Sequence, residues 1–412
     1  MQSTYTAQEL MDLEARYGAH NYHPLPVVLS RGEGVYVWDV NGKKYYDFLS
    51  AYSAVNQGHG HPAIVKALQE QAARLALTSR AFYNDRLGVY EEYITSYFGY
   101  DKVLPMNTGA EGVETAIKLV RKWAYEKRGV KPYNANIIVA AGNFHGRTTT
   151  IISFSTDPEA KDGFGPYTPG FTVIPYNDPE ALEKAVASNP DTVAFLVEPI
   201  QGEAGVIVPS EGYLKAAKEI CEKYNCLLIA DEIQTGIART GKLLASQYDG
   251  VRPDVLILGK ALSGGVYPIS AVLADDEIML SIKPGQHGST FGGNPVAASV
   301  GIAALEVVKN ENLADNAARM GQLFRDELNS RIGQHPLVKE IRGKGLLNAL
   351  EINDSPDSQT AWNICLQLAD KGLLAKPTHG NIIRFAPPLV INKDQIMESV
   401  DIISDTVLNH AG

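Results

Sequence analysis

The chain has 412 residues, of which 45% are hydrophobic and 20% charged, and a formal net charge of −10 at neutral pH. This length exceeds the size at which a single core keeps growing, so we expect a large domain with at least one smaller unit. The acidic balance argues against a nucleic-acid partner, and no apolar run approaches the length of a membrane span.

The cysteine content indicates a reducing compartment. Cys221, Cys226 and Cys365 are an odd number in a long chain, which argues against a disulfide scaffold. Cys221 and Cys226 lack a second Cys or His pair at zinc spacing, so we interpret them as buried thiols. Residues 1–20 are polar and mildly acidic, unlike a secretory signal or an Arg-rich presequence. We therefore expect a cytoplasmic location.

The N-terminal residues predict a small segment ahead of the main domain. We expect a short amphipathic helix, a Pro-rich loop and a hairpin turned by Asn41-Gly42, over residues 1–17, 21–26, 35–39 and 44–48. Pro62 then opens a helix. Its apolar face is expected to carry Ile64, Val65, Leu68 and Leu75.

From residue 51 to about 289 the pattern alternates strands and helices. The expected strands are continuous apolar runs at 136–140, 171–175, 193–198, 227–231, 255–258 and 269–273. Such runs are typical of an α/β fold with a mainly parallel sheet covered on both faces. After Asn294, helices and strands at 346–351 and 382–385 predict a smaller α+β domain. We place the boundaries at 1–50 for the N-terminal segment that packs with the small domain, 51–292 for the large domain and 293–412 for the small domain.

Two of these strands deliver an amine and a carboxylate at their ends. Lys260 follows the strand at 255–258, and Asp231 closes the strand at 227–231. The carboxyl ends of strands in an open α/β sheet are where such folds bind ligands. A lysine that forms a Schiff base and an acid that holds a pyridinium nitrogen are the equipment of a pyridoxal 5′-phosphate (PLP) enzyme. Taken singly, each residue has an equally good alternative interpretation. Lys260 could be a loop residue that points into solvent, and Asp231 could be a helix N-cap.

Further candidates follow other strands. The Thr108-Gly109-Ala110 turn opens a helix and predicts a phosphate cradle, although simple N-capping by Thr108 is common. After the strand at 136–140, Phe144 is placed to stack on a flat ring and Arg147 to clamp a carboxylate.

Two acids lie on the turn after the strand at 193–198. Glu198 is interpreted as structural, whereas Glu203 is expected to meet a cationic group in the cleft. His59 and His61 lie in a Gly/Pro setting without a third ligand, so we predict no metal site.

With these motifs in place, the chain resembles the class-III PLP-dependent aminotransferases, from Asn21 to roughly Ile391. General members share the Asp231 and Lys260 segments. The branch that acts on ornithine is indicated by the narrower stretches at 20–27, 48–59, 103–109 and 372–379. The resemblance implies the PLP-dependent transferase fold of type I and a homodimer with sites at the subunit interface.

The resemblance also implies residue roles. Lys260 would carry PLP and shuttle the proton, Asp231 would pair with the pyridinium nitrogen, and Gln234 would contact the ring hydroxyl. Phe144 and Ile233 would sandwich the ring. The remaining roles are phosphate binding by Gly109, Ala110 and the neighbouring subunit's copy of Thr290, α-carboxylate binding by Tyr22 and Arg147, shaping of the pocket by Tyr52, and a facing pair of Glu203 and Arg384.

The implied reaction moves the δ-amino group of L-ornithine to 2-oxoglutarate, giving glutamate 5-semialdehyde and L-glutamate. It would connect arginine metabolism with proline biosynthesis. Rival interpretations are a class-III ω-aminotransferase for acetylornithine or 4-aminobutyrate, and a PLP-fold protein without turnover. Two departures stand out: Gly60 replaces a frequent Cys, and His145 lies where some relatives carry Trp. We expect His145 to alter ring stacking or pocket polarity.

Overall fold

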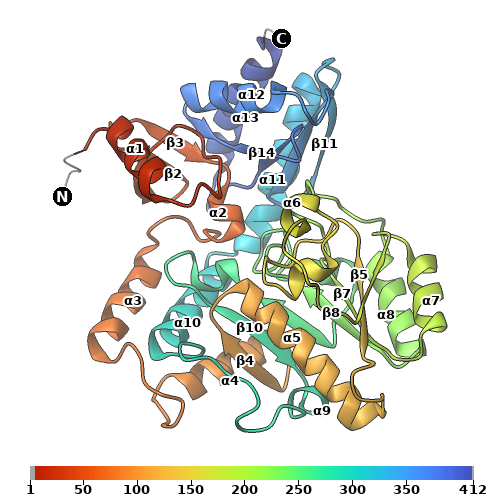
Figure 1. Ribbon diagram of the computed structural model, residues 1–412. Helices are drawn as coiled ribbons and strands as arrows, with labels where there is room; N and C mark the ends of the chain where they lie inside the picture. The colour runs from red at the N-terminus through yellow and green to blue at the C-terminus, as the bar shows by residue number, and fades with distance from the viewer. Residues whose placement is uncertain (1–4, 411–412) are drawn as a thin grey trace.

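The computed structural model describes residues 5–410 and centres on a seven-stranded sheet (Figure 1). In spatial order the strands are β4 (Lys102–Met106), β10 (Ser270–Ala274), β9 (Val255–Leu258), β8 (Leu227–Asp231), β7 (Thr192–Val197), β5 (Asn136–Ala140) and β6 (Phe171–Ile174). β10 is antiparallel to both β4 and β9, and the other pairs are parallel. The predicted mainly parallel α/β sheet is confirmed. β4 was missed, because Lys102 and Pro105 interrupt its apolar pattern.

Both faces of this sheet are covered, which explains why its strands are continuously apolar. Along β9, Val255 and Ile257 pack in one cluster with helix α5 (Gly109–Trp123), whereas Leu256 and Leu258 belong to the core on the opposite face. Figure 1 shows α5 crossing in front of β10 and β4. Other covering helices are α4 (Leu87–Phe98), α7 (Pro179–Ser188), α8 (Tyr213–Lys223) and α10 (Pro295–Asn310).

Two four-stranded sheets complete the architecture. The first has the order β1 (Leu29–Glu33), β2 (Tyr36–Asp39), β3 (Lys44–Asp47) and β13 (Leu373–Leu374). The second has the order β11 (Val338–Lys344), β12 (Leu347–Ile352), β15 (Ile382–Phe385) and β14 (Lys376–Thr378). The expected hairpin is confirmed as β2–β3, and the C-terminal strand β13 joins it in parallel. Figure 1 shows the N-terminal segment beside helices α11 (Leu313–Ile332), α12 (Thr360–Asp370) and α13 (Lys393–Leu408).

The first two helices differ in detail from the prediction. Helix α1 spans Ala7–Tyr17 and begins at a capping box of Thr6 and Glu9; residues 1–4 of the predicted helix lie outside the described residues. Helix α3 (Pro62–Arg74) buries Ile64, but Leu75 is 41% exposed. The placement of Leu75 on the buried face was wrong, because the helix ends at Arg74 and Leu75 adopts an extended conformation.

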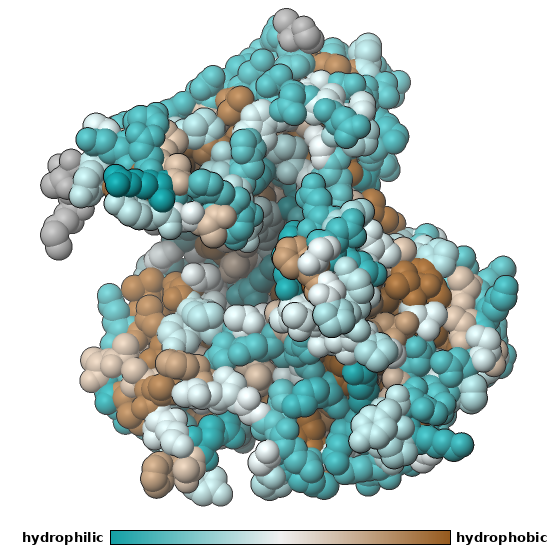
Figure 2. Space-filling model, in the orientation of Figure 1, coloured by the Kyte–Doolittle hydropathy of each residue, from teal (hydrophilic) through white to brown (hydrophobic). Residues whose placement is uncertain are grey.

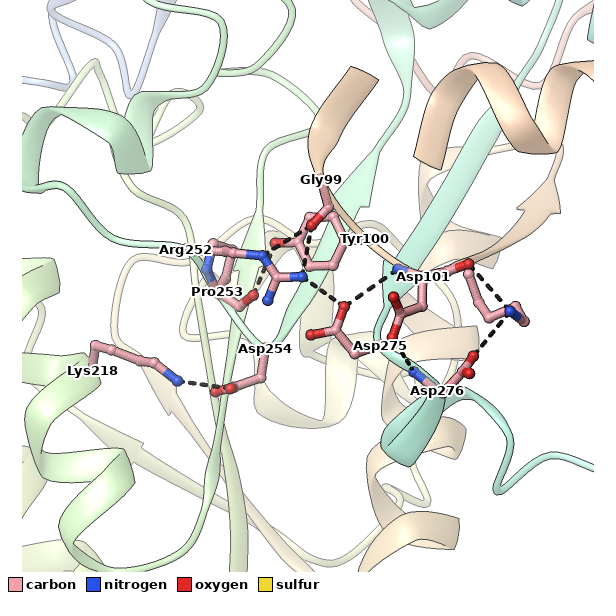
Figure 3. A network of polar contacts seen from close by, with 10 residues as sticks. Gly99, Tyr100, Asp101, Lys218, Arg252, Pro253, Asp254, Asp275 and Asp276 are labelled. Carbon is pink, nitrogen blue, oxygen red and sulfur yellow. Dashed lines mark hydrogen bonds and ion pairs between the residues drawn. The ribbon is translucent and has the colours of Figure 1, made fainter. Parts of the chain in front are cut away.

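A polar network fixes the end of β9 opposite Lys260 (Figure 3). The Arg252 guanidinium donates to the Gly99 carbonyl and to Asp275 Oδ1 at 2.6 Å, and lies 4.0 Å from the centre of the Tyr100 ring. Asp254 accepts from Lys218 Nζ at 2.7 Å and from the Leu228 amide at 2.8 Å. These contacts tie the entry of β9 to α4, α8 and β10, which fixes the strand that carries Lys260.

A buried guanidinium ties three distant parts of the chain together. Arg239 is fully buried and donates to Asn56 Oδ1, to the Leu346 carbonyl and to the Pro387 carbonyl. Burial lowers the pKa of Arg239 to about 9, although the charge of Asp47 opposes the shift. Because a buried donor left without its acceptor costs free energy, these contacts hold the three segments in register.

No helix among residues 5–410 is long and apolar enough to cross a membrane. The three cysteines are buried and free, as predicted. Figure 2 shows the surface hollowed between the N-terminal segment and the part of the molecule built on the large sheet.

Candidate active site

A cavity of about 140 Å³ opens at the carboxyl ends of β8 and β9. Its lining brings together residues from the turns after five strands. They are Gly109, Ala110, Phe144, His145, Gly146, Glu198, Glu203, Asp231, Ile233, Gln234, Thr235 and Lys260. Eight of the predicted site residues are in this set, which places the expected amine, carboxylate and helix N-terminus around one space.

Lys260 begins a short 3₁₀ turn (Lys260–Ser263) directly after β9. Its φ of +45° is in the left-handed region, a strained conformation for a residue with a side chain. Burial lowers the pKa of Lys260 to about 8, and the charge of Arg384 acts in the same direction, while Asp231 and Glu203 oppose it. A substantial fraction of this lysine is therefore a neutral amine near pH 8, the form that reacts as a nucleophile.

Asp231 is buried and held by two donors. Its Oδ1 accepts the Ile233 amide at 3.1 Å, and its Oδ2 lies 2.7 Å from His145 Nδ1. His145 is 3% exposed. Burial alone would lower the pKa of His145, but the hydrogen bond and charge of Asp231 outweigh it and raise that pKa. The two donors therefore hold the carboxylate of Asp231 in one orientation.

Glu198 lies buried behind this pair. Its Oε1 accepts the Phe144 amide at 2.8 Å, which fixes the backbone that carries Phe144 and His145. Burial raises the pKa of Glu198 to about 7, reinforced by Asp231 and opposed by the charge of His145 and by the Phe144 amide. Glu198 thus holds a cavity-lining segment, in keeping with its predicted structural role.

The N-terminus of α5 forms one wall of the cavity. Thr108 Oγ1 accepts the Glu111 amide and the Glu111 side chain accepts the Thr108 amide, so Thr108 is indeed a helix cap. Within residues 5–410, the amides of Gly109 and Ala110 donate to no other group. Free amides at a helix N-terminus bind anions, so capping and a phosphate cradle coexist here.

Close packing fixes Gln234 beside the amine. A Cβ at Gly202 would lie 1.4 Å from Gln234 Oε1, so this position has room for glycine only. Gln234 Nε2 donates to the Tyr52 carbonyl at 3.3 Å. The amide of Gln234 is thereby held at the cavity wall, near the strained segment that contains Tyr52 at φ +59°.

An ion pair closes one side of the cavity. Arg384 Nη1, from β15, donates to Glu203 Oε2 at 2.7 Å. The side chain of Arg384 is 5% exposed and that of Glu203 is 33% exposed. The guanidinium also lies 4.8 Å from the centre of the Tyr52 ring. The predicted facing of Glu203 and Arg384 is present, and Tyr52 contacts the pair.

Five predicted site residues lie outside the lining: Tyr52 and Arg384, which contact each other beside Glu203, and three exposed residues, Tyr22, Arg147 and Thr290. Tyr22 is 75% exposed. Arg147 is exposed, with its guanidinium 5.8 Å from the centre of the Phe144 ring. Thr290 is also exposed, on the loop before α10. The chain by itself therefore does not bring these three into the cavity.

The sequence interpretation gave His145 too small a part. It was noted only as a departure, yet its side chain contacts the key carboxylate directly. A histidine directly after Phe144, at the end of a buried strand, was the available signal. No group of three or more His, Cys, Asp or Glu arranged to hold a metal ion exists within the described part of the chain. His59 instead pairs with Asp47 at 2.7 Å.

Comparison with known proteins identifies the family. The family model described as Aminotransferase class-III matches residues 17–407. The ornithine aminotransferase, mitochondrial, of Drosophila melanogaster is 62% identical over 96% of this chain and 90% of its own. A crystal structure of acetylornithine aminotransferase from Elizabethkingia anophelis is 60% identical, with a TM-score of 0.91, over 99% of this chain and 100% of that chain. An ornithine aminotransferase structure from Toxoplasma gondii, described with partial occupancy of PLP at the active site, is 49% identical, with a TM-score of 0.96, over 99% and 95% of the two chains.

The chain belongs to the class-III aminotransferases, enzymes that use PLP. The cavity fits that cofactor chemically. The amine of Lys260, with its lowered pKa, suits the aldehyde of PLP, and the buried carboxylate of Asp231 in the lining suits the ring nitrogen. The amides of Gly109 and Ala110, which have no partner within residues 5–410, suit the phosphate. The predictions of the family, the fold class and the cofactor are confirmed.

Proposed function

We propose that this chain is an ornithine δ-aminotransferase, which converts L-ornithine and 2-oxoglutarate into L-glutamate 5-semialdehyde and L-glutamate. The observation that carries the proposal is the Glu203–Arg384 pair at the cavity wall. An enzyme that acts on ornithine must place the δ-amine at the cofactor while an α-carboxylate is present at the other end of the substrate. A masked arginine prevents that carboxylate from binding at the wrong end.

The cavity residues predicted to bind the cofactor have these places in the proposal. Lys260 holds PLP covalently, Asp231 binds the ring nitrogen and Gln234 the ring hydroxyl. Phe144 and Ile233 enclose the ring. The phosphate is bound by Gly109 and Ala110, together with Thr290 of the partner subunit. When bound, PLP supplies an electron sink that makes the hydrogen on the amine-bearing carbon acidic.

Lys260 moves the proton. With a pKa of about 8, about a quarter of its amine is neutral at pH 7.5, against about 0.1% for an unshifted lysine. The neutral amine of Lys260 would accept the proton from the amine-bearing carbon of the substrate at Nζ and hold it there for return. The negative charge of Asp231, fixed by the Ile233 amide, favours a protonated ring nitrogen and so strengthens the electron sink.

Substrate orientation uses separate arginines. Arg147 and Tyr22 bind the α-carboxylate of ornithine, and Tyr52 shapes the pocket between them and Lys260. When the glutamate skeleton binds, the Glu203–Arg384 pair opens, Arg384 takes the α-carboxylate and Arg147 the γ-carboxylate. A charge pair in a partly dehydrated cleft is worth a few kcal/mol at most, so a ligand carboxylate is able to displace it.

The competing candidate is an acetylornithine aminotransferase, the name carried by the Elizabethkingia structure. Acetylation removes the positive charge at the α-nitrogen. The two candidate substrates therefore differ in charge at the nitrogen beside their α-carboxylate. Spectral titration of the PLP form with ornithine, N-acetylornithine and 4-aminobutyrate tests this. A larger single-turnover rate constant per molar amine for ornithine supports the proposal; a larger value for N-acetylornithine overturns it. In a protein without turnover, none of the three amines would reduce the visible absorbance band of the PLP form.

The subunit arrangement and location are part of the proposal. We propose a homodimer whose interface carries the exposed apolar residues Phe82, Tyr83 and Phe291, which are 70%, 106% and 50% exposed. Figure 2 shows hydrophobic surface gathered over the region of α3 and α4.

The domain division and the location are also proposals. The proposed domains are residues 1–50, 51–292 and 293–412. We propose a cytoplasmic location, and imaging of the tagged protein tests it against the mitochondrial name of the Drosophila relative.

A further inference from the structure

The loop that carries Thr290 runs from the end of helix α9 (Asp276–Met279) to the start of α10, over residues 280–294. Thr290 is exposed, and the proposed function places it at the PLP phosphate of the partner subunit. Ordering a flexible segment on binding costs conformational entropy, so a loop that is already held in place binds a phosphate more tightly. The contacts that hold this loop therefore bear on cofactor binding.

A side chain of the loop, His287, joins it to helix α5. His287 Nδ1 lies 2.8 Å from Lys118 Nζ, and His287 Nε2 lies 2.8 Å from Thr115 Oγ1. Lys118 Nζ also donates to the Gln286 carbonyl at 3.4 Å. Helix α5 is the one whose first amides are proposed to bind the phosphate in their own subunit. Through His287 the same helix holds a loop that is proposed to serve the other subunit.

The hydrogen bonds define the protonation state of His287. A lysine ammonium only donates, so Nδ1 must accept and carries no proton. Thr115 has one hydroxyl hydrogen, which it donates to the Glu111 carbonyl at 2.7 Å, so its oxygen is left to accept from Nε2. A neutral imidazole with its proton on Nε2 satisfies all of these contacts. A protonated imidazole would instead point an N–H group at the Lys118 ammonium.

The charges around His287 favour the neutral form. The charged groups that face the imidazole are Lys118 and Glu111, both on α5. The carboxylate of Glu111 is already engaged, because its Oε2 accepts the amides of Asn107 and Thr108 at 2.8 and 3.0 Å. Partial burial and the charge of Lys118 lower the pKa of His287, while Glu111 opposes the shift. The contact is therefore complete at neutral pH and is lost as the pH falls below the ordinary histidine range, about 6.5.

A second anchor of the loop does not titrate. Asn107 Nδ2 donates to Ser289 Oγ at 2.7 Å, and the Gly292 amide donates to the same oxygen at 3.1 Å. A Cβ at Gly292 would lie 2.7 Å from the Pro105 carbonyl oxygen, so the loop passes the end of β4 at a distance that only glycine allows. Of the two anchors, the one at His287 is the one that responds to acid.

We propose that His287 is a positioning residue: as a neutral imidazole held by Lys118 and Thr115, it fixes the loop that delivers Thr290 to the PLP phosphate of the partner subunit, and its protonation releases this anchor. The inference rests on the proposed placing of Thr290 in the partner's site. It adds to the proposed function an acid-sensitive contact that links α5 of one subunit to the cofactor of the other. His287 itself touches neither the substrate nor the cofactor in this arrangement.

Two substitutions separate this role from simple packing. In His287→Asn the side-chain oxygen falls near the place of Nδ1, so the variant accepts from Lys118 and does not titrate. His287→Ala loses both contacts to α5. His335→Asn is the matched control, since His335 is also half-buried but lies on the turn after α11, outside the loop and the cavity lining. Unfolding midpoints and sedimentation control for folding and for loss of the dimer.

The readout is a pair of binding constants. Apoenzyme of each variant is titrated with PLP and with pyridoxal, which lacks the phosphate, from about pH 5 to about pH 8. The ratio of the two affinities isolates the phosphate contact, because capture by Lys260 is common to both probes. The phosphate itself titrates near about pH 6, so wild type and variants are compared with one another at each pH.

At about pH 7.5 we expect His287→Ala to lower the ratio of PLP to pyridoxal affinity about tenfold, with His287→Asn and the control close to wild type. Toward about pH 5 the wild-type ratio should approach that of His287→Ala, whereas His287→Asn should stay above both. A wild-type profile parallel to that of His287→Asn overturns the proposal. Equal ratios in wild type and His287→Ala at neutral pH overturn it as well.

Thr290→Ala distinguishes failure of this inference from failure of the proposed function. We expect it to lower the ratio by about ten- to hundredfold and to remove the further effect of His287→Ala in the double variant. If Thr290→Ala leaves the ratio unchanged, the placing of Thr290 fails and the inference fails with it. If Thr290→Ala lowers the ratio but His287→Ala does not, or if the two effects simply add, the placing of Thr290 stands and the role of His287 falls.

Discussion

Removing the charge of Glu203 is the sharpest perturbation of substrate choice that the structure offers. Arg384 is 5% exposed and has Glu203 as its only ion-pair partner within residues 5–410. In Glu203→Gln the shape is kept and the charge is lost, and in Glu203→Ala the guanidinium is uncovered altogether. In both variants Arg384 is free to bind a substrate carboxylate. We expect the glutamate half-reaction to gain relative to the ornithine half-reaction.

The size of the effect follows from the contact geometry. Two unit charges about 4 Å apart attract by about 4 kcal/mol at an effective dielectric constant of 20. Desolvation of the nearly buried Arg384 offsets part of this attraction, and the 33% exposure of Glu203 allows solvent to screen it. A net value of about 1–3 kcal/mol remains, which corresponds to about a five- to 150-fold change in the ratio of the two rate constants.

Stopped-flow half-reactions measure that ratio. The PLP form is mixed with ornithine and with glutamate, and the absorbance change is followed for wild type, Glu203→Gln, Glu203→Ala and Glu211→Ala. Glu211 is exposed and outside the cavity lining, so its variant serves as the charge-loss control. An unchanged ratio in both Glu203 variants would refute the masking of Arg384, and an equal change in the control would assign the effect to general electrostatics.

Further outcomes are expected from four other experiments. Lys260→Ala should fold and bind PLP weakly but lose transamination, since no tethered amine remains; near-normal turnover would remove Lys260 from the catalytic role. Asp231→Ala should slow single-turnover proton transfer far more than it lowers the unfolding midpoint, because the electron sink weakens; unchanged rates would make this carboxylate structural. Capture of PLP by wild-type apoenzyme should accelerate as pH rises toward about 8 and level off above it, because only the neutral amine of Lys260 reacts; a midpoint near pH 10 would contradict its lowered pKa. Arg252→Ala should lower the free energy of unfolding by about 1 kcal/mol, a modest value because the pair with Asp275 is half exposed, and leave kcat within twofold; a large loss of kcat with unchanged stability would contradict its structural role.

The parts of the fold that the sequence predicted are those with a repeated physical signal. β8 and β9 are unbroken apolar runs because both of their faces are buried, so their bounds could be predicted to the residue. β4 could not, since it is an antiparallel strand near the sheet edge that tolerates Pro105 and begins with an exposed lysine. β11 was missed for a related reason. None of its residues is fully buried, and its sequence mixes charged residues with Val338 and Ile341, which leaves no apolar run.

The candidate site shows the same division. Lys260 and Asp231 could be expected together because the ends of neighbouring parallel strands meet at one edge. The contact between His145 and Asp231 joins residues 86 positions apart through side-chain geometry, and no spacing rule encodes it. The exposed positions of Tyr22, Arg147 and Thr290 likewise could not be derived from local pattern. Their proposed contacts need a substrate or a second subunit.

The elements that carry the site divide its work. Lys260 and Asp231 come from the large sheet, and their positions are fixed by strand pairing and by the polar network at the far end of β9. Arg384 comes from β15, which belongs to a different sheet. Its guanidinium contacts Glu203 and the Tyr52 ring at the cavity wall. In the proposed function, proton transfer and the choice of carboxylate would therefore be carried by separately anchored elements. We expect a substitution at the Glu203–Arg384 pair to alter which end of a substrate is held without moving the amine that reacts. This separation would explain how one cavity accepts ornithine at its δ-amine and glutamate at its α-amine in alternate half-reactions.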